Sequence, residues 1–259
     1  MHRRTLLLLV VAGILAGQGR QIVVISHRGE HLHHPENTMP AFRAAVEAGA
    51  DYIEVDVRTT SDGKLVLMHN DTVDARTDGK GAVKDMTFEQ IRALDAGIKS
   101  GAEFAGTKVP TFDEALAFAR GKIDVYVDTK RASAADIVAA LERHDMQDHA
   151  VIYGGFEYLA QVAALRPKMK VMPESVSVAV IKKLIAELKP QVIAFGARDF
   201  TDEIIALARE ARAGIYVDRL GKEDTPEMWL DAVQRGATGI QTDKPGELVQ
   251  FLRSRGLHK

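Results

Sequence analysis

The residues best suited to chemistry lie close together near the start of the chain. His27-Arg28-Gly29 is followed by Pro35-Glu36-Asn37-Thr38, and Glu54-Val55-Asp56 and His69 come a little further on. These segments gather two histidines, an arginine and two carboxylates. A site that transfers a phosphoryl group with the help of a metal requires this set of residue types.

Two strand-like runs are expected to position these side chains. Residues 21–26 are mostly apolar and β-branched, so they predict a buried strand that delivers His27 and Arg28 at its carboxyl end. Residues 52–57 alternate, which predicts Glu54 and Asp56 on one face, about 7 Å apart. Two carboxylates on a buried strand are costly unless they are paired or bind a cation. We therefore expect metal ligation, with a salt-bridged or solvent-facing pair as the alternative.

The motifs resemble those of the glycerophosphodiester phosphodiesterase family over nearly all of the chain after its N-terminal segment. A lone His-Arg-Gly would indicate little. The ordered set is specific, because unrelated chains would not share both the residues and their spacing. Besides the segments above, the set includes residues 62–69, 74–81, 109–116 and 239–245.

The resemblance implies an α/β fold, a TIM-type (β/α)8 barrel, and hydrolysis of glycerophosphodiesters to glycerol phosphate and an alcohol. It implies His27 and His69 as general acid and base around one divalent cation. The cation is expected on Glu54, Asp56 and a third carboxylate, which by position is Asp128, where most relatives carry Glu. Hard carboxylate ligands favour Ca²⁺ or Mg²⁺, with Mn²⁺ as a further possibility.

Lys130 is expected to bind the substrate phosphate together with Arg28. It lies two residues after Asp128 and therefore on the same strand face. The Asp-x-Lys pair also resembles the sphingomyelinase D-like phospholipases, a sister group with the same barrel. One alternative function is therefore a phospholipase D-like phosphodiesterase acting on lysophospholipid or sphingomyelin. A non-catalytic phosphodiester-binding barrel is a more distant alternative.

The segment before the next helix is expected to support this site. The family match assigns Glu36 and Asn37 as residues that bind or orient groups beneath the His27 loop. The alternative is a turn that only starts the helix, for which Thr38 is a good N-cap. The histidines at 31, 33 and 34 suggest zinc, but carboxylate ligands favour harder cations. We therefore expect these three to be surface histidines, with occasional contact to the substrate as the alternative.

The sequence departs from the family pattern at several positions. Asn70 follows His69 where relatives carry Asp. Gly155-Phe156 replaces a Ser-Phe pair, and Tyr216-Val217-Asp218-Arg219 replaces Trp-Thr-Val-Asn. The resemblance places the last two segments against the alcohol half of the substrate. The chemistry is thus better defined than the choice of alcohol.

Strand-like and helix-like runs alternate along the chain. Strands are predicted near 22–26, 52–57, 65–68, 123–128, 150–153, 169–172, 191–195, 214–218 and 238–241, and helices at 178–188, 203–212, 227–235 and 246–254. The link between 52–57 and 65–68 is too short for a crossover helix and predicts a hairpin. Residues 70–110 are too long for an ordinary connection and predict a small cap with a helix near 87–95.

N-capping patterns mark the starts of several predicted helices. Thr87 with Gln90 and Thr111 with Glu114 form capping-box patterns, and Thr225 is followed by proline. We therefore expect helices to begin at these positions. Since no linker or repeat stands out, residues 20–259 are expected to form one catalytic barrel domain.

The N-terminus predicts export. Arg3 and Arg4 precede an apolar run at 6–16, too short for a comfortable membrane span, and small residues come before Arg20. We expect residues 1–19 to be a secretory signal and the mature protein to be periplasmic or extracellular, without a stable membrane span. An uncleaved membrane anchor is the alternative.

Composition agrees with a small-molecule enzyme. The 259 residues are 46% hydrophobic, with a formal net charge of −2 and no cysteine. A barrel of about 250 residues is typical as one domain, and without a basic stripe no nucleic-acid partner is expected. The expected partner is a glycerophosphodiester, and the sequence makes no prediction of the oligomeric state.

Overall fold

One sheet contains the nine strands of the part of the chain described by this computed structural model, residues 21–259. The strands are β1 (Val23–Ser26), β2 (Tyr52–Thr59), β3 (Leu65–Leu67), β4 (Asp124–Arg131), β5 (Ala150–Gly154), β6 (Lys170–Pro173), β7 (Val192–Phe195), β8 (Gly214–Arg219) and β9 (Gly239–Thr242). Each corresponds to a predicted strand. Both β2 and β4 continue beyond their predicted ends, so Lys130 lies within β4.

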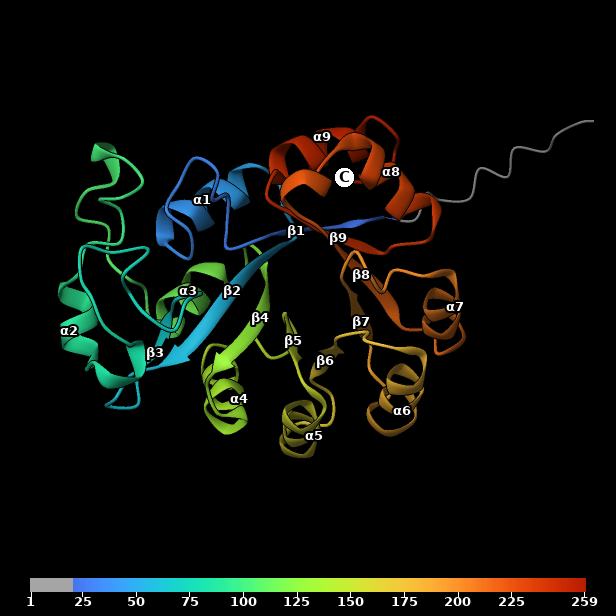
Figure 1. The fold of residues 1–259 in the computed structure, drawn as a ribbon, viewed down its shortest axis with the longest axis horizontal. Helices are drawn as coiled ribbons and strands as arrows, with labels where there is room; N and C mark the ends of the chain where they lie inside the picture. The colour runs from blue at the N-terminus through green and yellow to red at the C-terminus, as the bar shows by residue number, and fades with distance from the viewer. Residues whose placement is uncertain (1–20) are drawn as a thin grey trace, which may run out of the picture.

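The strands form a nearly closed barrel (Figure 1). Parallel neighbours follow the order β6-β5-β4-β2-β1-β9-β8-β7. Between β6 and β7 the described residues make a single bridge, from Glu174 to Ala194, where the Ser175 N–H donates to the Ala194 carbonyl at 2.9 Å. The predicted α/β barrel of TIM type is confirmed, and so is the hairpin, because β3 pairs antiparallel with β2.

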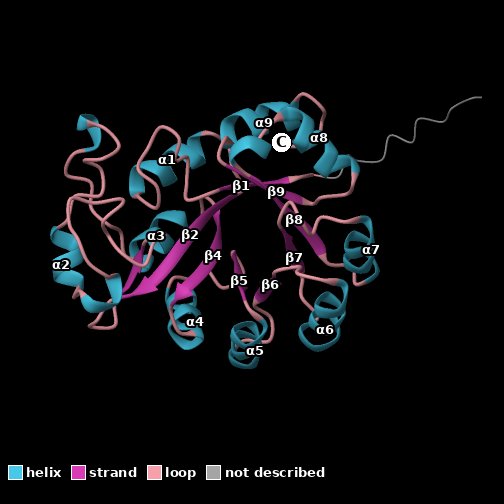
Figure 2. Cartoon of the chain, viewed as in Figure 1, coloured by secondary structure: helices cyan, strands magenta, loops and turns pink. Residues whose placement is uncertain are grey.

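Helices surround the ring of strands (Figure 2). They are α1 (Met39–Glu47), α2 (Phe88–Ala93), α3 (Phe112–Ala119), α4 (Ala134–Arg143), α5 (Phe156–Leu165), α6 (Val178–Leu188), α7 (Asp202–Glu210), α8 (Pro226–Gln234) and α9 (Pro245–Arg253). Both predicted capping boxes are present, at Thr87 and Thr111. Thr225 accepts a hydrogen bond from the Met228 N–H, as expected of an N-cap.

The expectation for the Thr38 side chain is wrong. Thr38 occupies the N-cap position of α1, but its hydroxyl donates to the Pro35 carbonyl at 2.5 Å and accepts no helix N–H. The hydroxyl closes the preceding turn and does not accept from the Ala41 N–H at the third helical position, the position whose N–H Thr87 and Thr111 accept in their capping boxes.

Strand alternation divides the core into layers. On β2, Ile53, Val55 and Val57 are fully buried against the outer helices. Ile25 and Tyr126 belong to a separate cluster of inward-facing residues from β1, β2 and β4 to β7. This interior is packed with side chains, so the polar groups of the inner faces gather at the ends of the strands.

The insertion between β3 and α3 has a small hydrophobic cluster of its own. It carries α2 and two short 3₁₀ turns, Val83–Asp85 and Ala102–Phe104, and lies beside the barrel next to β3 (Figure 1). Val73, Val83 and Ile91 are buried there against Val66 of β3. The predicted helix near 87–95 is therefore present as α2.

The described helices can be compared with the length and apolar character of a membrane span. Among residues 21–259, no helix combines the length and the apolar character needed to span a bilayer. The predicted signal at residues 1–19 lies outside the described residues.

Candidate active site

The predicted site residues come from the carboxyl ends of neighbouring strands. His27 follows β1, Asp56 lies on β2 and Asp128 lies on β4. The register of β2 and β4 pairs Asp56 with Asp128 and Glu54 with Tyr126. Because register partners in a sheet point to the same face, the three carboxylates project together into the mouth of the barrel, the end at which barrel enzymes hold their substrates.

Glu54, Asp56 and Asp128 form one carboxylate cluster. Each offers an oxygen within 4.8 Å of the others, and Glu54 and Asp56 are 2% and 1% exposed. A cation with ligand distances of about 2.0–2.6 Å fits between oxygens at such separations. Burial raises the pKa of Glu54 well above its usual range, and the charges of Asp56 and Asp128 raise it further. The donor set is therefore suited to a hard divalent cation.

Two cationic side chains lie against the carboxylate cluster. The Lys130 Nζ is 2.6 Å from an Asp128 oxygen and 3.2 Å from an Asp56 oxygen. Burial lowers the pKa of Lys130, but Asp128 and Asp56 outweigh this and raise it, so the ammonium stays charged. The Arg28 Nε is 3.5 Å from Asp56. Together with a bound metal, Lys130 and Arg28 would present positive charge to a phosphate.

The loop after β1 is held in an unusual backbone conformation. Arg28 has φ 55°, in the left-handed region that non-glycine residues seldom adopt. Its N–H donates to Glu54 at 2.8 Å, and its guanidinium donates to Glu36 at 3.1 Å. Arg76 of the insertion forms an ion pair with Glu36 at 3.0 Å. Glu36 thus links the Arg28 side chain to the insertion.

Asn37 joins the same loop to β2. Its Nδ2 donates to Asp56 at 2.7 Å, and its Oδ1 accepts from the Asp56 N–H at 3.1 Å. The Asn37 N–H donates to the Arg28 carbonyl at 3.0 Å. The structure therefore places Asn37, which is 3% exposed, beneath the His27 loop, where it fixes the Asp56 carboxylate.

His27 is oriented by a residue that the sequence reasoning did not single out. The His27 Nδ1 lies 2.8 Å from Asp243, which follows β9. A carboxylate only accepts, so Nδ1 carries the proton and Nε2 is left to accept one. Burial lowers the pKa of His27, while the hydrogen bond to Asp243 opposes this shift. A neutral His27 with a free Nε2 is suited to proton transfer.

The expectation that all three neighbouring histidines are surface residues is wrong for His31. Its Nε2 lies 2.8 Å from the same Asp243 oxygen, and its ring meets that of His27 edge-on at 5.3 Å. Asp243 acts as a shared acceptor, which the sequence could not reveal because 212 residues separate it from His31. His33 is exposed and His34 partly so, and both pair with Glu30.

Asp243→Asn is expected to lower kcat about 10- to 100-fold, by analogy with carboxylates that orient the imidazole of metal-bound histidines. KM should change little, because within residues 21–259 the Asp243 side chain accepts hydrogen bonds from neither Arg28 nor Lys130. Asp243 raises the pKa of His27, so the limb of the pH–rate profile that reports His27 should move to lower pH. An unchanged profile would show that Asp243 is only structural.

His69, the second predicted catalytic histidine, follows β3. Its Nδ1 is 2.8 Å from the Asn70 Oδ1, an acceptor, so this nitrogen donates. Burial raises the pKa of Asp128, and Lys130 first and His69 after it oppose this rise. Asn70 supports the His69 ring through a neutral acceptor.

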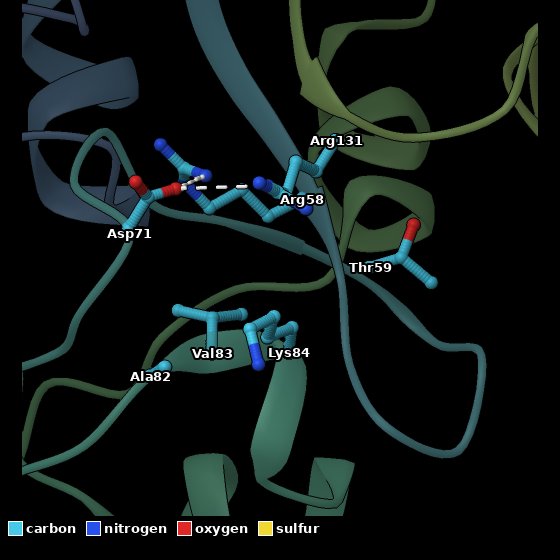
Figure 3. A pocket seen from close by; sticks show the side chains of 7 residues that line it. All are labelled: Arg58, Thr59, Asp71, Ala82, Val83, Lys84 and Arg131. Atoms are coloured by element: carbon cyan, nitrogen blue, oxygen red, sulfur yellow. Dashed lines mark hydrogen bonds and ion pairs between the residues drawn. The ribbon is translucent and has the colours of Figure 1, made fainter.

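A second unpredicted residue, Arg58, holds the segment that carries His69. Arg58 is 7% exposed and donates to the Met68 and His69 carbonyls at 2.9 and 2.5 Å. It also pairs with Asp71 at 2.5 Å, and Arg131 approaches the same carboxylate at 3.9 Å (Figure 3). These groups line a cavity of about 110 Å³ beside the site.

The sequence contains features that could have identified both Arg58 and Asp243 as site residues. Arg58 continues the alternation of Glu54 and Asp56 and would have been found if β2 had been extended past residue 57. Asp243 lies directly after the predicted last strand, within a motif shared with the family. What the sequence lacked was the pairing of β9 with β1, which brings Asp243 to His27.

Comparison with known proteins agrees with this geometry. Residues 27–247 match the Glycerophosphoryl diester phosphodiesterase family. The chain is 33% identical over 248 residues to a glycerophosphodiester phosphodiesterase of Caldanaerobacter subterraneus subsp. tengcongensis, covering 90% of this chain and 99% of that protein. A glycerophosphodiester phosphodiesterase from Agrobacterium tumefaciens str. C58 has a TM-score of 0.80 at 29% identity, covering 88% of this chain and 99% of that one.

A phosphodiesterase from Oleispira antarctica, solved with its product sn-glycerol-3-phosphate, shares the fold with a TM-score of 0.82 at 22% identity, covering 90% of this chain and 97% of that one. Fold and similarity define the class as a TIM-barrel phosphoric diester hydrolase. The chain belongs to the glycerophosphodiester phosphodiesterase family. This sets aside the alternative of a non-catalytic barrel.

Proposed function

We propose that this protein is a metal-dependent glycerophosphodiester phosphodiesterase that works by acid–base catalysis with two histidines. The observation that carries the proposal is the carboxylate cluster of Glu54, Asp56 and Asp128, whose oxygens lie within 4.8 Å of one another. Without a cation these buried negative charges repel, as the raised pKa of Glu54, caused first by burial, indicates. We propose Ca²⁺ or Mg²⁺ as the ion, with Mn²⁺ as a further candidate.

In this proposal, the predicted site residues bind the phosphate, hold other side chains in place or transfer protons. A cation on the cluster would polarise a phosphoryl oxygen. Arg28 and Lys130 would hold the phosphate, and Glu36 and Asn37 would keep Arg28 and Asp56 in place. One histidine of the pair His27 and His69 removes a proton from a glycerol hydroxyl, which attacks phosphorus, and the other protonates the departing alcohol. Water then opens the cyclic phosphate with the roles exchanged.

Hydrolysis of a defined substrate tests this function. The purified protein, stripped with a chelator, should release glycerol phosphate from glycerophosphocholine only after Ca²⁺ or Mg²⁺ is restored. Full activity in excess chelator would overturn the metal requirement. Faster turnover of lysophosphatidylcholine than of glycerophosphocholine would instead support the phospholipase D-like alternative.

We also propose that the protein is exported, on the strength of the charged and apolar pattern of residues 1–19. The expected mature chain begins near Arg20. Mass spectrometry of protein recovered from its natural host measures this directly. An intact Met1 on a membrane-bound form would contradict the proposal.

A further inference from the structure

A groove opens from the carboxylate cluster toward the β5–β6 side of the barrel. It has a volume of about 290 Å³ and begins at Asp128. Tyr153 of β5 and Phe156 of α5 line it, as does Glu174, which follows β6. Since Asp128 belongs to both the groove and the cluster, the groove adjoins the place where a phosphodiester held at the cluster would lie.

Most of the groove wall is apolar. Besides the aromatic residues it is lined by Pro173, Val176, Val180 and Leu184, of which Val176 and Val180 are 63% and 41% exposed. Such a wall offers few partners for the hydroxyls of a glycerol or sugar alcohol. It suits a group whose surface consists of methyls.

The charge near the groove is negative. Glu174 and Asp128 are the charged residues that line it. Lys130 lies 2.6 Å from Asp128 and balances its charge, so Glu174 supplies the remaining negative charge. Lys183 lies 4.7 Å over the Phe156 ring but does not line the groove. A cation entering the groove would be attracted by Glu174.

We propose that this groove binds a quaternary ammonium group on the alcohol half of the substrate. Apolar and aromatic walls with a carboxylate at the rim are the means by which proteins recognise methylated ammonium ions. The methyls would pack against Phe156 and Val180, and the charge would face Glu174. This inference rests on the proposed function, since it assigns the alcohol that the enzyme releases.

Three substrates with the same glycerol phosphate half test the assignment. The wild-type enzyme should show a kcat/KM for glycerophosphocholine about two- to fivefold above that for glycerophosphoglycerol, a factor typical of a solvent-exposed cation–π contact. Glycerophosphoethanolamine should fall between them. Hydrolysis of none of the three would overturn the proposed function itself, whereas equal rates or a preference for glycerophosphoglycerol would overturn only the groove assignment.

Two variants separate the groove from the rest of the enzyme. Glu174→Gln, at an exposed position, should bring the choline-to-glycerol ratio of kcat/KM close to one, mainly through KM for glycerophosphocholine. Asp145→Asn is the matched control, because Asp145 is 68% exposed and pairs with Arg120, and lies before β5 at the other end of the barrel. It should keep the wild-type ratio. An unchanged ratio in Glu174→Gln would contradict the proposal.

Inhibition by free alcohols tests whether the groove recognises the charge of the ammonium group or only its shape. Choline and its neutral isostere 3,3-dimethylbutan-1-ol should differ as inhibitors of bis(p-nitrophenyl) phosphate hydrolysis, with choline the stronger in the wild type. Glu174→Gln should weaken inhibition by choline and leave the isostere nearly unaffected. Equal inhibition by both alcohols in the wild type would show a merely apolar groove and reject the cation site.

Discussion

Replacing His27 or His69 with Ala should lower turnover of glycerophosphodiesters by about 10²- to 10⁴-fold, the range that a positioned acid or base contributes. The two residues follow different strands, His27 after β1 and His69 after β3. Displacement at phosphorus needs a proton removed on one side and supplied on the other. Steady-state kinetics with glycerophosphocholine measures the loss, and His149→Ala, at a site 62% exposed, is the matched control.

The leaving group distinguishes the two histidines. An alcohol needs a proton as it departs, but p-nitrophenolate needs little help, so a p-nitrophenyl ester should partly rescue the variant that lost the acid. The variant that lost the base should stay slow. Equal rescue of both variants, or wild-type rates from either, would show that the acid and base lie elsewhere.

Asp56→Asn should abolish metal-dependent activity and metal binding together. Asp56 contacts both Lys130 and Asn37 and is 1% exposed. Because the position is buried, a carboxylate from the protein surface cannot replace Asp56 in the cluster. Saturating Ca²⁺ or Mg²⁺ at about 100 times Kd should raise the Tm of the wild type by about 5–10 °C. The variant should show neither this shift nor activity.

A control variant distinguishes loss of metal binding in Asp56→Asn from unfolding of the protein. Glu142→Gln removes a surface carboxylate of α4 that pairs with Arg166, and it should keep both the thermal shift and the activity. Circular dichroism should show Asp56→Asn folded in the absence of metal. A full metal-induced shift in Asp56→Asn would exclude Asp56 from the cation site.

Local patterns predicted most of the fold. Alternation on β2 placed Glu54 and Asp56 inward, and the short turn-rich link predicted the β2–β3 hairpin. Capping boxes at Thr87 and Thr111 marked helix starts because their hydrogen bonds join residues three apart. Such signals depend only on neighbours along the chain, so the sequence contains all that is needed to find them.

Groups that meet only through tertiary structure were not predictable in the same way. Asp243 approaches His27 because β9 pairs with β1, 216 residues apart. The Thr38 hydroxyl donates to the Pro35 carbonyl instead of accepting a helix N–H, and the sequence pattern does not decide between these two local hydrogen bonds. The groove beside Asp128 is formed by strands β4 to β6 together with α5 and α6, and no single motif describes it.

The single bridge between β6 and β7 has a mechanical consequence. On the far side of the ring, β2 and β4 are paired from Tyr52 to Arg58, and this long ladder carries the carboxylates. At the seam only the Glu174–Ala194 bridge joins the two strands within the described residues, and the Gln191 side chain accepts from Val171 in place of a backbone carbonyl. Because few backbone hydrogen bonds cross this seam, we expect it to open more readily than the β2–β4 ladder, and amide hydrogen exchange should be faster in β6 and β7 than in β2 and β4.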